Sequence, residues 1–175
     1  TINGGDAVDT IDFRLSSANL TYNGGNDGAG GDDGSSVITL GSGTNVITFA
    51  AATAVSHKVT INTGTDKITF DGAVTDTVVI SNGDLTAADT IDGDAALDTF
   101  SVDNSTTLLD AAFTNVDNME HIAVKTNAVQ LNLTLGTLAE AAGIHTITGG
   151  NAGDTIDASG YAALAMDIIG GTGDD

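Results

Sequence analysis

A twelve-residue motif recurs at widely separated places along this chain. Residues 1–12 read TINGGDAVDTID and residues 146–157 read TITGGNAGDTID, with 9 of 12 positions identical. A weaker copy at residues 90–101, TIDGDAALDTFS, matches the first copy at 6 positions. Each copy places a glycine-containing turn between two short stretches of strand-forming residues. A chain built from such units is expected to stack them against one another, because one unit alone cannot bury its apolar side.

The turns recur at a step of about 20 residues. Gly149-Gly150 and Gly170-Gly171 lie 21 residues apart, and the same separation joins Asn45 to Asp66. Two short strands and two turns, which make one coil of a β-solenoid, take about this many residues. The sequence therefore predicts an all-β fold, a parallel β-solenoid (β-roll or β-helix) with coils of about 20 residues.

Strands and helices can be assigned from the residue pattern. Helical periodicity is limited to short excursions at Thr107–Phe113, Leu135–Ala142 and Gly160–Met166. Because the chain starts and stops inside a motif, residues 1–175 are expected to form one solenoid segment of a longer secreted protein, with an alternative sub-boundary near 103–117. Seven short, mostly alternating stretches are predicted as strands: Val37–Leu40, Val46–Phe49, Val59–Ile61, Lys67–Phe70, Thr77–Ile80, His121–Val124 and Val129–Leu133.

The charge of the chain is carried almost entirely by aspartate. Acidic residues outnumber basic residues by 24 to 4, and Glu120 and Glu140 are the only glutamates. Aspartate is favoured in turns and in oxygen-rich cation sites, whereas a merely solubilising surface would use glutamate as readily. The four basic residues are scattered, which argues against binding to nucleic acid or to anionic membranes. No apolar run approaches the length of a membrane span, and without cysteine there is no thiolate metal site.

The glycine-rich turns resemble the RTX calcium-binding β-roll, whose nonapeptide is G-G-x-G-x-D-x-U-x, with U apolar. Residues 170–175, GGTGDD, match its first six positions. GGNAGDTID at 149–157 and GGDAVDTID at 4–12 match except at the fourth position, where Ala152 and Ala7 replace glycine. The C-terminal third of the chain also resembles large S-layer and related surface proteins of Gram-negative bacteria.

The resemblance implies a Ca²⁺ cofactor. Calcium takes six to eight oxygen ligands at roughly 2.3–2.6 Å, which glycine-turn carbonyls and the sixth-position aspartate would supply. In the RTX family one turn gives half a site and the next coil completes it, which pairs Asp154 with Asp175, and Asp9 with Asp32 or Asp33. The implied calcium ligands are Asp9, Asn26, Asp27, Asp32, Asp33, Asp98, Gly149, Gly150, Asn151, Asp154, Gly170, Gly171, Asp174 and Asp175.

The alternative for these turns is purely structural, with aspartates that end strands as Asx-turns and bind no metal. Alanine at the fourth position favours this alternative, since alanine is strained where φ is positive. Asn45, Asp66 and Asp89 are spaced for a second stack, but their turns lack the glycine pair, so a structural role is expected for Asp66 and Asp89. His57 and His145 lie in turns and are expected at the surface.

These features favour a structural surface protein over an enzyme, and no catalytic residue is assigned. We expect a calcium-stabilised segment of a bacterial S-layer or extracellular filament, secreted to the cell surface, where copies self-assemble. Cell-surface polysaccharide is a further expected partner, through regions outside this segment. A tandem stalk or ligand-binding module of a giant RTX adhesin is the alternative, because the two best motif copies are offset by 145 residues. A β-helix polysaccharide-modifying enzyme is less favoured, because the chain has few basic residues and few aromatic platforms.

Overall fold

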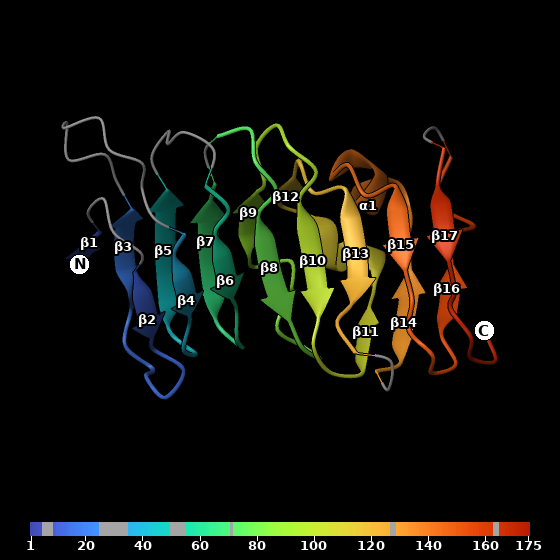
Figure 1. Ribbon diagram of the computed structural model, residues 1–175, viewed down its shortest axis with the longest axis horizontal. Coiled ribbons are helices and arrows are strands. Elements are labelled where there is room, and N and C mark those ends of the chain that lie inside the picture. Colours follow the sequence, from blue (N-terminus) through green and yellow to red (C-terminus); the bar gives the residue numbers. More distant parts are fainter. Residues whose placement is uncertain (5–8, 25–34, 50–54, 71, 127–128, 163–164) are drawn as a thin grey trace.

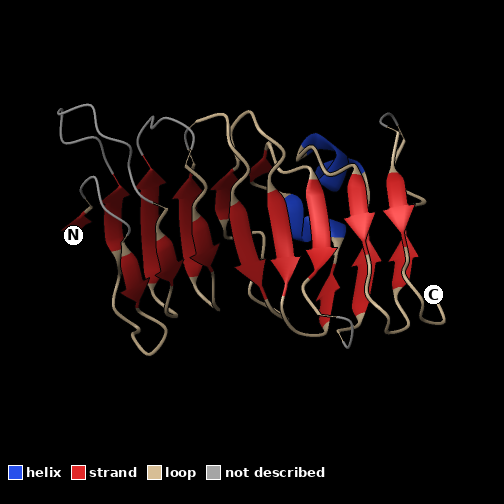
Figure 2. Cartoon of the chain, in the orientation of Figure 1, coloured by secondary structure: helices blue, strands red, loops and turns tan. Residues whose placement is uncertain are grey.

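The fold is a parallel β-solenoid, as the sequence predicts. The computed structural model describes residues 1–4, 9–24, 35–49, 55–70, 72–126, 129–162 and 165–175. The strands lie side by side along the long axis, and the two termini are at opposite ends (Figure 1). Strands dominate, and helices are short and lie in the C-terminal half (Figure 2). In the described residues no helix is long and apolar enough to cross a membrane.

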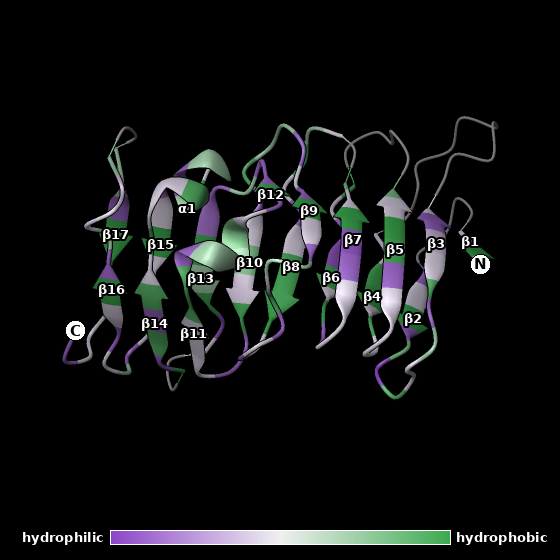
Figure 3. Cartoon of the chain, turned by 180° about the vertical axis from the view of Figure 1, so that it is seen from behind, coloured by the Kyte–Doolittle hydropathy of each residue, from purple (hydrophilic) through white to green (hydrophobic). Residues whose placement is uncertain are grey.

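Three parallel sheets contain the strands. The eight-stranded sheet holds β2 (Thr10–Asp12), β4 (Val37–Thr39), β6 (Lys58–Thr60), β8 (Thr77–Ile80), β10 (Thr99–Val102), β13 (His121–Val124), β15 (Thr146–Thr148) and β17 (Asp167–Ile169). The six-stranded sheet holds β1 (Ile2–Asn3), β3 (Thr21–Gly24), β5 (Thr44–Phe49), β7 (Thr65–Thr69), β9 (Thr90–Asp92) and β12 (Val116–Asp117). The three-stranded sheet holds β11 (Thr106–Leu108), β14 (Leu131–Thr134) and β16 (Thr155–Asp157). The six-stranded and three-stranded sheets are seen from behind in Figure 3.

The register of the eight-stranded sheet gives the length of each coil. The coil that leads from Lys58 to its partner Thr77 is shorter than the coil that leads from Thr10 to its partner Val37. The solenoid has about 7 turns of roughly 22 residues, close to the predicted length. Because the strands pair in parallel and in register, partner residues on successive coils point to the same face of the sheet. The residues that point inward therefore form continuous columns, which make up the core.

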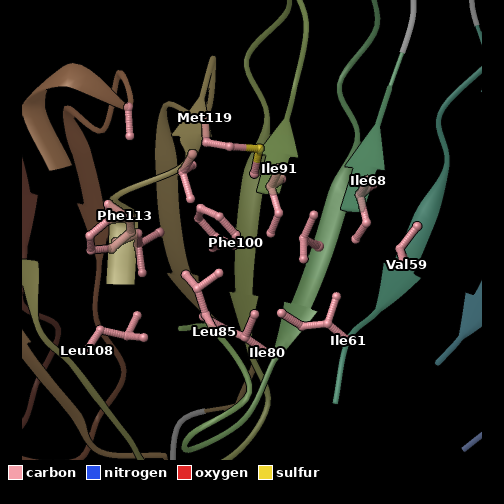
Figure 4. Packing of buried hydrophobic residues seen from close by; sticks show 14 of the residues in the cluster. Val59, Ile61, Ile68, Ile80, Leu85, Ile91, Phe100, Leu108, Phe113 and Met119 are labelled. Atoms are coloured by element: carbon pink, nitrogen blue, oxygen red, sulfur yellow. The ribbon is translucent and has the colours of Figure 1, made fainter. Parts of the chain in front are cut away.

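The core is a narrow stack of aliphatic side chains between the sheets. Ile47, Ile68 and Ile91 are partners in register on neighbouring strands, and all three are fully buried. Figure 4 shows Ile68 and Ile91 pointing into the same interior as Phe100 of the eight-stranded sheet. Each fully buried aliphatic side chain of this size contributes roughly 1.5–3 kcal/mol, so the repeated column supplies much of the stability.

Aromatic rings stack at the N-terminal half of this core. The rings of Phe49 and Phe70 are nearly parallel, with centroids 5.3 Å apart. The His57 ring stacks on Phe49 at a centroid distance of 4.0 Å. His57 is 4% exposed, so the expectation that it lies at the surface is wrong. The His57 ring lies in the interior because it packs on Phe49 and because its Nδ1 accepts the Ser36 N–H at 3.3 Å.

The predicted secondary structure is mostly confirmed, and two of the three predicted helical excursions depart from it. Thr77–Ile80 and His121–Val124 are strands with the predicted bounds, and the helix expected within Leu135–Ala142 is α1 (Thr137–Ala141). The predicted helix at Thr107–Phe113 is wrong in its first half, because Thr106–Leu108 pairs with β14 and only Asp110–Phe113 forms a turn of 3-10 helix, η1. The described part of Gly160–Met166 contains no helix.

The copies of the twelve-residue motif occupy different corners of the solenoid. In residues 1–12 and 90–101 the turn leads from the six-stranded sheet to the eight-stranded sheet, whereas in 146–157 it leads from the eight-stranded to the three-stranded sheet. Equivalent residues of the first and last copies therefore lie in different sheets. The eight-stranded sheet continues past the suggested sub-boundary near 103–117, since β10 pairs directly with β13.

Candidate functional site

Asp154 and Asp175 are neighbours on successive coils, as their spacing predicts. The Asp154 N–H donates to Asp175 Oδ1 at 3.0 Å, and the Gly149 N–H donates to the Ile169 carbonyl at 2.8 Å. The turns stack so closely that a Cβ on Gly171, where φ is +110°, would overlap the Gly150 carbonyl oxygen. The link between the two aspartates is therefore a backbone-to-carboxylate hydrogen bond.

Both carboxylate oxygens of Asp154 accept hydrogen bonds. Oδ1 accepts the Leu131 N–H of the preceding coil at 2.8 Å, and Oδ2 accepts the Gly150 N–H at 2.9 Å. Asp154 is 3% exposed, so these bonds form away from water and are charge-assisted. Each oxygen of this carboxylate therefore already has one backbone donor.

The first glycine of each turn makes room for the aspartate five residues later. A Cβ on Gly149 would overlap Asp154 Oδ2. The same relationship joins three further pairs: Gly4 with Asp9, Gly93 with Asp98, and Gly170 with Asp175. The spacing G-x-x-x-x-D thus describes one structural turn in which the carboxylate folds back over the glycine.

The other predicted ligands are dispersed or lie outside the described residues. Asp9 Oδ2 accepts the Tyr22 hydroxyl at 2.8 Å, which ties the first coil to β3. Asn151, Gly171 and Asp174 are exposed. The pairing of Asp9 with Asp32 or Asp33 stays a prediction, because four candidates lie outside the described residues: Asn26, Asp27, Asp32 and Asp33.

Polar side chains stand one coil apart at the corners of the solenoid, in three columns, and most of them are buried. The first column is Asn45, Asp66 and Asp89; the second column is Ser36, His57, Asp76, Asp98 and Glu120; the third column is Asp154 and Asp175. The first column lies at the start of strands of the six-stranded sheet, and the second lies directly before strands of the eight-stranded sheet. In the third column, Asp154 is buried directly before β16, whereas Asp175 is exposed at the end of the chain. The stacking of Asn45, Asp66 and Asp89 follows the predicted spacing.

Hydrogen bonds run along the second column from coil to coil. The His57 N–H donates to Asp76 Oδ1 at 2.5 Å, and the Asp76 N–H donates to Asp98 Oδ1 at 2.6 Å. The Asp98 N–H donates in turn to Glu120 Oε2 at 2.8 Å. Each of these carboxylates accepts a hydrogen bond from a backbone N–H that lies just before a strand and is not paired within the sheet. The columns therefore cross-link successive coils.

Stacked acids in a buried column hold protons unusually tightly. Burial is the main cause that raises the pKa of Asp98 to about 7, and the neighbouring charges of Asp76, Glu120 and Asp94 raise it further. Burial likewise raises the pKa of Asp76 and of Asp66 to about 6. The charges that act on Asp98 are all negative. The column is thus an electrostatically unfavourable arrangement that a proton or a cation would relieve.

The turn 93–98 departs from the regular turn at 149–154. Asp94 replaces the second glycine and has a φ of +79°. Its N–H donates to Asp92 Oδ1 at 3.2 Å, whereas the equivalent Gly150 N–H donates to its own turn's aspartate. Asp94 Oδ2 and Asp98 Oδ2 are consequently buried without a hydrogen-bond partner. Among the described side chains Asp66 Oδ2 shares this property.

The second column is the feature that sequence reasoning missed. Among its members the glycine motif predicts Asp98 alone as a ligand. His57, Asp76, Asp98 and Glu120 each lie directly before a strand, at successive separations of 19, 22 and 22 residues. That spacing is available in the sequence, but the change of residue type from histidine to aspartate to glutamate hides it.

Metal chelation by side chains alone is not built into the described part of the chain. No group of three or more His, Cys, Asp or Glu side chains there converges as a metal ion requires. Within the turn 93–98, Asp94 and Asp98 each have a buried carboxylate oxygen without a hydrogen-bond partner.

No protein-family model matches this chain, and no curated protein or solved structure is significantly similar to it. The resemblance to RTX repeats therefore rests on the motif residues alone. The architecture around those residues is a β-solenoid.

Proposed function

We propose that this chain is a structural segment, a calcium-stabilised β-solenoid of a secreted bacterial surface layer or extracellular filament. The observation that carries the proposal is the second column, in which buried acids on successive coils are hydrogen-bonded to one another's backbone. A ladder of this kind makes a long, stiff body rather than a cleft for a substrate. Its weak point is the repulsion between the acids it buries.

Calcium relieves that repulsion in the proposed mechanism. The chain carries 20 net negative charges, which oppose compaction when counter-ions are dilute. Each bound Ca²⁺ cancels two charges, and because the sites need the folded coils, binding stabilises the fold. Calcium is scarce in the cytosol and abundant outside the cell, so the exported chain folds where it is to assemble. The partners in this proposal are further copies of the same protein.

A tandem module of a giant RTX adhesin is the alternative. Its support from sequence is the 145-residue offset between motif copies. The two copies lie in different sheets, so a module of that length would not stack in phase on the next one. The surface-layer or filament segment is therefore the better supported proposal, and the similarity to RTX repeats is retained as part of it.

Thermal unfolding with and without calcium tests the proposal. The chain is melted by far-UV circular dichroism in millimolar CaCl₂, in EGTA, and in EGTA with added NaCl to match ionic strength. One ion present at about 100 times its Kd contributes about 2.7 kcal/mol, which raises Tm by about 5–10 °C for a chain of this size. Equal Tm values in calcium and in ionic-strength-matched EGTA would contradict the proposal, because simple screening would then explain any salt effect.

A further inference from the structure

We propose that the turn 93–98 is a cation site, with Asp94 and Asp98 as its carboxylate ligands and a divalent cation such as Ca²⁺ as its occupant. The inference rests on the proposed function in that both invoke calcium. The motif resemblance already implies Asp98 as a calcium ligand, but it gives no role to Asp94 and implies the double-glycine turns at 149–154 and 170–175 as well. The unpartnered oxygens favour the turn 93–98, in the middle of the solenoid.

Asp98 provides the first observation. The side chain is fully buried, its Oδ1 accepts the Asp76 N–H at 2.6 Å, and its Oδ2 has no hydrogen-bond partner in the described structure. An unpaired buried polar group destabilises a fold, and a charged one does so more strongly. Asp154 is at the same position of its turn, but its Oδ2 has a partner, because it accepts a hydrogen bond from the Gly150 N–H. Asp98 Oδ2 is therefore open to an exogenous partner.

Asp94 provides the second, independent observation. An aspartate at φ +79° occupies the position where the regular turn has glycine, although the left-handed region is unfavourable for a non-glycine residue. Its N–H turns away to Asp92, and its Oδ2 is buried without a partner. The positive φ of Asp94 and its unpartnered carboxylate oxygen both destabilise the fold. A cation shared with Asp98 would offset the destabilisation by the unpartnered oxygen.

The charges around the turn favour a cation over any other ligand. Asp76 on the preceding coil and Glu120 on the following coil both act on Asp98. The basic residues whose ion pairs are seen lie elsewhere: Arg14 pairs with Asp12, and Lys125 pairs with Asp103. The charges that act on Asp98 are those of acids, so a cation from solution is the ligand that they favour.

The number of carboxylate ligands determines the affinity for calcium that we expect of this site. Because no three acidic side chains converge in the described structure, the ion has two carboxylates and completes its shell with backbone carbonyls and water. Extracellular calcium modules of low ligand charge bind with a Kd of about 10⁻⁴–10⁻³ M. The site is expected in that range, which suits an ion taken up outside the cell.

Calcium titration calorimetry on four variants tests the inference. Asp98→Asn removes one ligand charge. Asp94→Gly restores the glycine of the regular turn, tolerates the positive φ, and is expected to fold at least as well as the parent in EGTA. Asp154→Asn changes a double-glycine turn, and Asp157→Asn removes an exposed charge. The first two variants are expected to bind one calcium fewer than the parent, and the other two to bind as many as the parent.

Each other outcome decides against the site. If the parent binds calcium and Asp94→Gly binds the same number, the inference is overturned while the proposed function stands. If Asp154→Asn is the variant that loses an ion, the double-glycine turn holds the metal instead. If the parent binds none, and Asp94→Gly alters only the pH dependence of stability, the two carboxylates share a proton. That result would overturn the inference and the proposed function together.

Discussion

The carboxylate of Asp154 folds back over the α-carbon of Gly149, so that a Cβ at residue 149 would overlap Oδ2. Hydrogen bonds from Leu131 and Gly150 hold the carboxylate in this place. The five-residue spacing between glycine and aspartate is therefore set by steric fit, whatever the metal content of the turn. Four turns share this relationship, two of them at the corner that leads into the eight-stranded sheet.

Gly149→Ala is expected to destabilise the chain by about 2–3 kcal/mol, because the methyl group must displace a buried, doubly hydrogen-bonded carboxylate. Urea unfolding measures the change. Gly83→Ala is the matched control: its φ is +82°, but a Cβ there meets nothing within 4 Å, so it costs conformational strain of roughly 1–2 kcal/mol without a clash. Equal losses for the two variants would show that the overlap with Asp154 is unimportant.

Asp89→Ala tests the first column. Asp89 Oδ1 accepts the Asp66 N–H at 2.8 Å, and Oδ2 accepts the Thr86 N–H at 2.8 Å and the Thr86 hydroxyl at 3.1 Å. Truncation leaves these donors without their acceptor and is expected to cost about 3 kcal/mol of unfolding free energy. Asp167→Ala, at an exposed position, should stay within about 0.5 kcal/mol of the parent. A loss for Asp89→Ala no larger than the control's would mean that the column does not hold the coils together.

Phe70→Ala tests the aromatic stack. Phe70 is 2% exposed and its ring lies against Phe49, so truncation opens a cavity in a core that has few large side chains. The expected loss is about 3–5 kcal/mol in calorimetric or urea unfolding. Leu97→Ala is the control, because Leu97 is 64% exposed and should change stability little. A small loss at Phe70 would indicate that the coils collapse readily around the missing ring.

The calcium-free chain is expected to become more stable as the pH falls from about 8 to about 6. The pKa of Asp98 is about 7 in the folded chain, against about 3.9 for an unfolded aspartate, so in this interval the folded state binds a proton that the unfolded state does not. The stabilisation is lost as the pH rises through 7. The groups facing Asp98 are the acids Asp76, Asp94 and Glu120, which act in the same direction.

Asp98→Asn isolates this effect in calcium-free melts across the same interval. Burial lowers the pKa of His57 and of His121, which destabilises the fold as the pH falls, but both histidines are present in parent and variant. The difference between the two chains is expected to change by on the order of 1 kcal/mol over the interval. Parallel pH profiles for parent and variant would show that Asp98 keeps an ordinary pKa.

The sequence predicts the fold better than the site. A regular step between like turns requires stacked coils, and the β-branched residues of Thr77–Ile80 locate its strand to the residue. Local pattern fails at Thr107, where β14 on the next coil recruits residues of helical periodicity into β11. Pairing with a strand of another coil overrides local propensity, and no short window of sequence contains that information.

The site illustrates the same limit. The spacing brings Asp154 to Asp175 and Asp66 to Asp89, and both neighbours are found. Which oxygen of each carboxylate is already used by a backbone donor depends on the conformation of one residue in the turn. The left-handed Asp94 leaves Asp98 Oδ2 unpaired, whereas Gly150 fills the equivalent oxygen of Asp154. That difference is set by three-dimensional geometry rather than by the motif.

A crystal structure of the chain grown in calcium, with anomalous data to locate the ion, tests the central claim most directly. The account predicts an anomalous peak at the turn 93–98, bonded to Asp94 Oδ2 and Asp98 Oδ2 at roughly 2.3–2.6 Å. A turn in which these two oxygens share a short hydrogen bond, with calcium absent there or found only at the double-glycine turns, would contradict it.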